Sequence, residues 1–541
     1  MAYLMNKYST YLLILLITSL NALPYYCSEP GVPSSFSNST RVPAPVNLPS
    51  TAQLLTVSAV IRHGARTPYE PSYCWKGYLD SDAAKWDCDT SMVMSITPTA
   101  SSTYSRESNL LFKKVYDGLT PPLTNELQGT CHVGQLISTG VTQETINGEA
   151  LRRAYVGDDD SVNLFPSSGS NLGPGGPVSG RVVFRGDDQQ RTLMSGQILV
   201  EALFPTTESS SGVENVLVDW HTADYDADPI YPNSKVCPRL KELQDAAVST
   251  PEFQAFNNSA EAQELEKVML DDLGGADWRH ILDCQMTSIC TGRPLPSVLD
   301  DFVEDDDESM FSRIYSHASD QLGKVYTLNS NAYAKLAMAP VLSDILTSTL
   351  LPSLSATKRD DLDTLLHVTS GHDTTVMPLL AALGVWDGKW APYASLVVME
   401  TYYIPNNDDF KSNRGFRIVY NGDVLTDKME GCEGAGEICD LQVLVDYLSE
   451  FATNDRDCEL KGPEVKPEGS KEGMQISTSG WLIILFFTTA ASTVITAFFV
   501  SGRIGGDKGG NFLKLEDGDG TEGGGRNGHM RNYASNDDDD V

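Results

Sequence analysis

Residues 54–68 read LLTVSAVIRHGARTP, and this stretch decides both the fold class and the place of the candidate site. Residues 54–61 form a short, mainly apolar and β-branched run, which is typical of a buried strand. Arg62, His63 and Arg66 follow that run directly, and open α/β sheets bind ligands beyond the carboxyl ends of their strands. Arginine presents a planar fork of donors that suits phosphate oxygens, and histidine is the natural nucleophile toward phosphorus. The stretch therefore predicts an anion site at a strand end.

A second strand, turn and helix lie at residues 182–204. Val182 to Phe184 predicts a short strand, and the pair Asp187–Asp188 predicts a turn and the N-cap of a helix over 189–204. Arg191 lies in the first turn of that helix, where unpaired N–H groups and the helix dipole favour a bound anion. Arg191 is therefore a further candidate for holding phosphate, and a surface ion pair is the alternative.

A third segment of this kind includes a His-Asp pair. Leu365 to Thr369 predicts a strand, residues 374–383 predict a helix, and Gly384 stands where a glycine often ends one. His372 and Asp373 lie at the junction between strand and helix. The three strand ends together supply three arginines, two histidines and one carboxylate, which is the inventory for phosphoryl transfer through a covalent intermediate.

The repeated order of strand, turn and helix favours an α/β sheet with helices on both faces. Residues 237–334 are mostly helix-like, so we interpret them as an inserted cap, whereas the irregular residues 70–130 look like an insertion in the core. The predicted organisation is a linker at 23–50, an α/β catalytic domain at 51–236 and 335–458, a helical cap at 237–334 and a stalk at 459–480.

The composition of the 541 residues excludes some partners. There are 39 Lys+Arg against 73 Asp+Glu, a net charge of −34, so the chain has no basic excess with which to bind a nucleic-acid backbone. A sequence pI of about 4.5 is compatible with an acidic compartment. The acidic run from Asp300 to Glu308 predicts a solvated surface, and repulsion of highly charged substrates is the alternative.

Both ends of the chain indicate export to a membrane. Residues 1–22 resemble a signal peptide, with an uncleaved anchor helix as the alternative. Residues 481–500 carry no charge over a length that spans a bilayer core, which predicts one transmembrane helix. The polar residues 501–541 predict a cytoplasmic tail and argue against a glycolipid anchor. We therefore expect a type I membrane protein with a luminal or extracellular catalytic domain, at the cell surface or in endosomal or lysosomal membranes.

Cysteine usage agrees with an oxidising compartment. All ten cysteines precede the predicted span and none forms a CxxC pair, so up to five disulfides are expected, with free buried thiols as the alternative. The short-range candidates are Cys432 with Cys439 and Cys284 with Cys290. Sequons at Asn38 and Asn257 predict glycosylation if exposed.

The motif RHGARTP at 62–68, together with HD at 372–373, resembles the histidine acid phosphatases, a branch of the phosphoglycerate-mutase-like superfamily. The similarity covers roughly residues 54–450 and is weakest in 70–130 and in the cap. With its signal peptide, span and tail, the chain is most similar to single-pass membrane-bound acid phosphatases. Further similar stretches are GQLISTGVTQ at 134–143, RTLMSG at 191–196, GHDTTVMPLLAALG at 371–384 and PYAS at 392–395.

This resemblance implies a fold and a role for each candidate. The fold would be a phosphoglycerate-mutase-like sheet flanked by helices, with a smaller, mainly helical cap. His63 would be the nucleophile that forms a phosphohistidine, and Asp373 would be the proton donor. No metal or other cofactor is implied, and the substrate would be a small phosphate monoester hydrolysed in acid. The phosphate oxygens would be held by Arg62, Arg66, Arg191 and His372.

Two departures from the family pattern leave alternatives open. The insertion at 70–130 lengthens the chain between Arg66 and Arg191. Leu396 stands where close relatives have a cysteine after PYAS, so Cys237 needs another partner or stays free. The alternatives to a general acid phosphatase are a narrow phosphatase for inositol polyphosphate, phosphosugar or phospholipid, and a non-catalytic phosphate-binding receptor. A homodimer is left open.

Overall fold

The computed structural model describes Cys27 and residues 41–459, with gaps of which the largest are 96–110, 114–126, 173–177, 206–217 and 453–457. The predicted signal peptide, the sequon at Asn38, the transmembrane helix at 481–500 and the tail lie outside the described residues.

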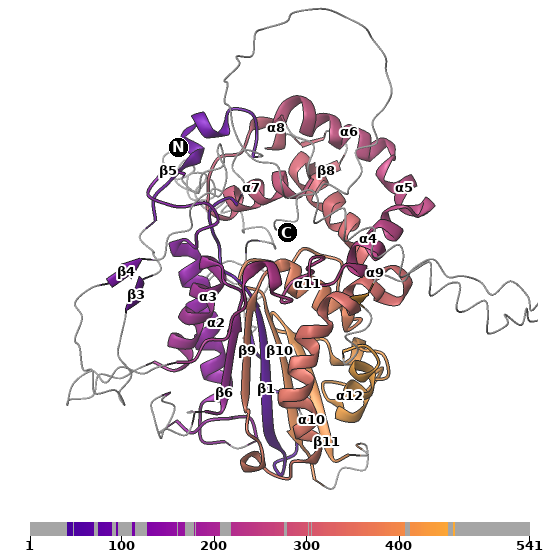
Figure 1. The fold of residues 1–541 in the computed structure, drawn as a ribbon. Helices are drawn as coiled ribbons and strands as arrows, with labels where there is room; N and C mark the ends of the chain where they lie inside the picture. Colours follow the sequence, from indigo (N-terminus) through magenta and orange to yellow (C-terminus); the bar gives the residue numbers. More distant parts are fainter. Residues whose placement is uncertain are drawn as a thin grey trace, which may run out of the picture. The chain divides into compact units, whose positions relative to one another are not determined.

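A seven-stranded mixed sheet forms the centre of the molecule (Figure 1), in the order β12-β11-β10-β1-β9-β6, with β13 paired to β11. β1 lies between parallel β9 and antiparallel β10, and β6 runs parallel to β9. The carboxyl ends of β1, β9 and β6 therefore meet at one edge, as the sequence predicts. The strands are β1 (Gln53–Arg62), β6 (Val182–Gly186), β9 (Leu366–Gly371), β10 (Leu396–Tyr403), β11 (Arg414–Tyr420), β12 (Asp423–Val424) and β13 (Cys439–Asp440).

Helices cover both faces of the sheet, which confirms the predicted α/β class (Figure 1). Val57, Ala59 and Ile61 of β1 belong to one buried cluster with residues of α2 and α3. Ser58 alternates with these residues along the strand, and its hydroxyl hydrogen-bonds the hydroxyl of Thr349, which lies between α9 (Met310–Ile345) and α10. The helices of the core are α2 (Ser138–Tyr155), α3 (Gln190–Leu203), α10 (Leu351–Ser355), α11 (Asp373–Ala382) and α12 (Leu441–Ser449).

The segment predicted as a cap is mainly helical and also contains a short hairpin, β7 (Phe302–Val303) with β8 (Asp306–Ser309), inside the acidic run. Asn257 ends α5, and its carboxamide oxygen accepts from Gln321; glycosylation there stays a prediction. The helices are α4 (Arg239–Val248), α5 (Pro251–Asn257), α6 (Ala260–Val268), α7 (Trp278–Cys290), α8 (Ser297–Asp300) and the first part of α9 (Met310–Ile345).

Helix α9 passes from the cap to the sheet through a sharp kink. Asn329, Ser330 and Asn331 have φ of 51°, 57° and 66°, and asparagine tolerates this left-handed region better than most residues. Among the described residues, Met310–Ser355 is the one helical segment that is long and apolar enough to cross a membrane. Half of its most apolar stretch is buried inside the fold. That burial is typical of a core helix.

The insertion between β1 and α2 adds two small strand pairs to the core. β2 (Lys85–Trp86) pairs in parallel with β5 (Gln128–Gly129), and β3 (Val93–Ser95) pairs antiparallel with β4 (Leu111–Lys113). A short 3-10 turn, Tyr78–Asp80, precedes β2. The Tyr78 ring is buried and its hydroxyl accepts from the Trp86 indole at 2.9 Å. Tyr78 belongs to a small buried cluster that this part of the insertion shares with Cys284 of the cap.

All ten cysteines are paired in five disulfides. The prediction of a Cys284–Cys290 bridge is wrong, because both residues lie on α7. Six residues of α-helix rise about 9 Å, which exceeds the roughly 7 Å between Cα atoms that a disulfide can span. Cys237, left without a partner by the sequence, pairs with Cys458. The bridges are Cys27–Cys290, Cys74–Cys284, Cys88–Cys131, Cys237–Cys458 and Cys432–Cys439.

Candidate active site

The parallel register of β1 and β9 brings the two predicted histidines together. Arg62, the last residue of β1, pairs with Gly371, the last residue of β9. A histidine follows each of them, and the His63 N–H donates to the Gly371 carbonyl at 2.9 Å. The ring centroids of His63 and His372 are therefore only 5.4 Å apart, in an edge-to-face arrangement.

His63 is buried and its tautomer is set by a neighbouring carbonyl. Its Nδ1 lies 2.8 Å from the Gly64 carbonyl oxygen. Since a carbonyl can only accept, Nδ1 carries the hydrogen, and Nε2 of the neutral ring keeps its lone pair. Burial lowers the pKa of His63 well below its ordinary value, and the charges of Arg191, Arg66 and Arg62 lower it further. The imidazole is therefore uncharged and nucleophilic in mildly acidic solution.

Close packing holds the loop that carries His63. A Cβ on Gly64 would lie 2.6 Å from the Cα of Gly140 in α2, so glycine is required here by the close approach of two backbones. The Gly64 N–H donates to Ser195 of α3 at 3.0 Å, and the Ala65 N–H donates to Gln143 of α2 at 2.8 Å. Both helices thus fix the loop.

Arg62 is fixed on two sides. Its guanidinium contacts the Asp373 carboxylate at 2.9 Å and donates to the Ala391 carbonyl at 2.6 Å. It also lies over the Tyr393 ring, 4.2 Å from the centroid, where a cation is attracted to the π face. These contacts orient a positive charge beside His63.

Arg66 and Arg191 add two more cations around His63. Their guanidinium carbons lie 6.0 and 5.0 Å from the centroid of the Tyr69 ring, which is half-buried. Burial, followed by the charge of Arg66, lowers the pKa of Arg191 to about 10, so it stays protonated at acid and neutral pH. The Nε atoms of Arg62, Arg66 and Arg191 are buried and have no hydrogen-bond partner among the described residues. Buried donors of this kind cost free energy unless an anion binds, so the three suit a phosphate group.

Asp373 begins α11 and has three partners. Its Oδ2 accepts from the Trp390 indole N–H at 2.7 Å and contacts Arg62, and its Oδ1 accepts from the Thr374 N–H at 2.9 Å. Burial raises the pKa of Asp373, but Arg62, the Trp390 hydrogen bond and His372 together outweigh burial and bring the pKa below its ordinary value. The carboxylate is therefore ionised except in acid.

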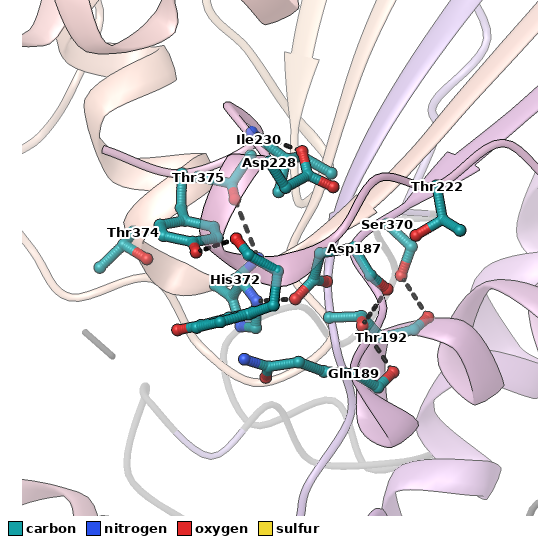
Figure 2. Close-up of polar contacts among 12 residues, drawn as sticks. Asp187, Gln189, Thr192, Thr222, Asp228, Ile230, Ser370, His372, Thr374 and Thr375 are labelled. Atoms are coloured by element: carbon teal, nitrogen blue, oxygen red, sulfur yellow. Dashed lines mark hydrogen bonds and ion pairs between the residues drawn. The ribbon is translucent and has the colours of Figure 1, made fainter. Parts of the chain in front are cut away.

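His372 is held by the buried carboxylate of Asp187, for which the sequence predicts a role as a helix N-cap. Figure 2 shows the Asp187 carboxyl group and the His372 ring pointing toward one another, with His372 Nε2 2.9 Å from Asp187 Oδ2. The predicted N-cap at Asp187–Asp188 is wrong: Gln189 is the N-cap of α3 and makes no side-chain cap bond. Asp187 instead orients His372, because the β6–α3 loop lies beside the end of β9.

The cap supplies a further carboxylate to the site, which no sequence pattern predicts. Asp283 of α7 contacts Arg66 at 2.7 Å and accepts from the Tyr69 N–H at 2.9 Å. Its separation from Arg66 in the chain is long, and no motif marks it. The structure thus brings all six predicted site residues into one cluster and adds Asp187 and Asp283 to it.

Comparison with known proteins agrees with this geometry. The sequence model of the histidine phosphatase superfamily (branch 2) matches residues 53–421. The chain is 28% identical over 423 residues to counting factor 60 of Dictyostelium discoideum, covering 78% of this chain and 89% of that protein. It is 24% identical over 404 residues to lysophosphatidic acid phosphatase type 6 of Homo sapiens, covering 74% and 84%.

The lysosomal acid phosphatase of Rattus norvegicus is similar over a shorter stretch. It is 29% identical over 303 residues, which cover 52% of this chain and 63% of that protein. The family match covers all six predicted site residues in one continuous range, from β1 through β11. The chain therefore belongs to the histidine phosphatase superfamily (branch 2) and is a histidine-type phosphomonoesterase.

Proposed function

We propose that this phosphatase hydrolyses phosphate monoesters in acid through a phosphohistidine at His63. The observation that carries the proposal is a neutral, buried imidazole whose Nε2 lone pair is free, surrounded by three arginines with unpartnered Nε donors among the described residues. The positive charges of the three arginines would draw in a phosphate group and disfavour protonation of the nucleophile.

In the first step, His63 Nε2 attacks phosphorus and the bond to the ester oxygen breaks. Asp373, protonated, gives its proton to the departing alkoxide, so the alcohol leaves neutral. The non-bridging oxygens would be held by Arg62, Arg66, Arg191 and His372, whose donors stabilise the charge of the transition state.

In the second step, water attacks the phosphohistidine. The Asp373 carboxylate takes a proton from the water, the N–P bond breaks and inorganic phosphate leaves. Asp187 keeps His372 oriented through both steps by its contact with Nε2. The cycle returns His63 to the neutral ring and Asp373 to its protonated form.

The pKa of Asp373 predicts the direction of the pH profile. Because its surroundings lower that pKa, the protonated fraction needed for the first step falls as pH rises through the acid range. Activity toward esters with poor leaving groups should therefore decline from acid toward neutral pH.

Replacing Trp390 with phenylalanine tests this origin of the acid optimum. The change removes a 2.7 Å hydrogen bond to the charged form of Asp373, so the pKa of Asp373 should rise. The alkaline limb of the kcat profile should therefore move to higher pH. The matched control is Trp386→Phe, whose indole donates to the Lys389 carbonyl, away from Asp373. Equal shifts in both variants would contradict the assignment of Asp373.

The membrane anchor is part of the proposal. Five disulfides favour an oxidising compartment, such as a lumen or the extracellular side. Cys458, which precedes the stalk, is tied to Cys237 in the cap segment. We propose that residues 481–500 span the membrane and leave the catalytic domain on that side.

The proposed activity is tested on the full chain in detergent with p-nitrophenyl phosphate, from pH 3 to 8, with EDTA present. We expect hydrolysis that peaks in acid and does not depend on added metal. Parallel assays with lysophosphatidate and inositol hexakisphosphate separate a general phosphatase from a narrow one. A folded protein that binds phosphate but turns over none of these esters would favour a binding role instead.

A further inference from the structure

Helix α7 of the cap contributes two side chains to the surroundings of Arg62 and Arg66, two of the proposed phosphate ligands. Asp283 and Thr287 are four residues apart, so they lie on one face of the helix. Asp283 contacts Arg66, and the Thr287 hydroxyl lies 2.9 Å from the hydroxyl of Tyr393, the ring that stacks on Arg62. One turn of the cap therefore reaches the surroundings of both arginines that flank His63.

Asp283 uses both carboxylate oxygens on the loop that follows His63. Oδ1 lies 2.7 Å from an Nη atom of Arg66, and Oδ2 accepts from the Tyr69 backbone N–H at 2.9 Å. The side chains of Arg66 and Asp283 are only 10% and 16% exposed. Asp283 therefore ties together the two ends of residues 66–69 in a mostly dry environment, where a charged hydrogen bond is strong.

The remaining contacts of Arg66 show which edge of its guanidinium is left for a ligand. The second Nη donates to the Thr67 carbonyl at 3.0 Å, while Nε is buried and has no partner in the described part of the chain. Both Nη atoms are thus held by protein, and Nε–H remains as a free donor. Without Asp283, the Thr67 carbonyl would be the one remaining contact of the two Nη atoms among the described residues, so the guanidinium would be held less firmly in this orientation.

Two disulfides keep α7 in place. Cys284, next to Asp283, is bonded to Cys74, which follows Tyr69 closely in the chain. Cys290, at the end of α7, is bonded to Cys27. The two bridges therefore link α7, beginning at the residue after Asp283, to the insertion segment and to the N-terminal segment.

We infer that Asp283 is a positioning residue for phosphate binding, through which the cap holds Arg66 and Tyr69 in the binding arrangement. The inference rests on the proposed role of Arg66 as a phosphate ligand. The contrary reading is that Asp283 competes with phosphate for Arg66, in which case removing the carboxylate would strengthen phosphate binding.

The test compares Asp283→Ala and Asp283→Asn in the full chain. We expect Asp283→Ala to raise the KM for p-nitrophenyl phosphate and the inhibition constant of inorganic phosphate about 10-fold, since a charged hydrogen bond is lost, with kcat changed much less. Asp283→Asn, which can still accept one hydrogen bond, should give an intermediate effect. The matched control is Glu266→Gln, which removes one exposed negative charge from α6 and should leave both constants unchanged.

Stabilisation by inorganic phosphate in thermal unfolding gives a second readout that does not require turnover. If wild type binds phosphate but hydrolyses nothing, the proposed function fails while the positioning role can still be measured. An alanine variant that folds and binds phosphate as tightly as wild type, or more tightly, would overturn the inference. If the alanine variant does not fold, the isosteric Asp283→Asn decides by the same two measurements.

Discussion

Replacing His63 with alanine is expected to lower kcat by about 10⁴-fold or more, because the covalent route loses its nucleophile. In wild type, a rapid quench in alkali after mixing with ³²P-labelled substrate should trap label on His63, since an N–P bond survives alkali and breaks in acid. The alanine variant should carry no label. Phosphate binding should persist in part, because the three arginines and His372 remain.

The matched control replaces another buried histidine of the same sheet. His367 lies on β9, opposite Ser58 of β1, and its ring contacts Ser348 and Asp344 rather than the site. His367→Gln should keep the label and most of the activity if the protein folds. Label that persists after His63→Ala would show that another residue is phosphorylated.

Replacing Asp373 with asparagine should have the next largest effect, and its size should depend on the leaving group. Loss of general acid catalysis should slow the first step by ~10²–10⁴-fold for glycerol phosphate, whose alkoxide needs a proton. p-Nitrophenyl phosphate should be much less affected in this step, because nitrophenolate leaves without one. The comparison is made by kcat/KM for the two esters.

The same variant should also accumulate the covalent intermediate. Asparagine cannot take a proton from water, so hydrolysis of the phosphohistidine becomes the slow step for p-nitrophenyl phosphate. Stopped-flow measurement should then show a burst of about one nitrophenolate per protein molecule. Equal losses for both esters, without a burst, would exclude Asp373 as the acid and base.

Much of this protein follows from local sequence patterns. The apolar run of β1 and the residues just after it predict a strand end with two arginines and a histidine, and two later strands predict further ends that lead to Arg191 and His372. Because parallel strands end at the same edge of a sheet, three local patterns were enough to place the predicted site residues together. The Cys432–Cys439 bridge is also local, with a sequence separation of 7.

Only the tertiary structure decided which distant groups complete the site. Cys74 pairs with Cys284 across a separation of 210 residues, and the same helix brings Asp283 to Arg66; no periodicity or motif marks either contact. Asp187 looked like a helix cap because Asp is common there, but the adjacent end of β9 offered its carboxylate a buried imidazole instead. Contacts of this kind depend on how the cap and the strand ends pack in space. A pattern of neighbouring residues in one sequence does not predict that packing, because the contacting residues are far apart in the chain.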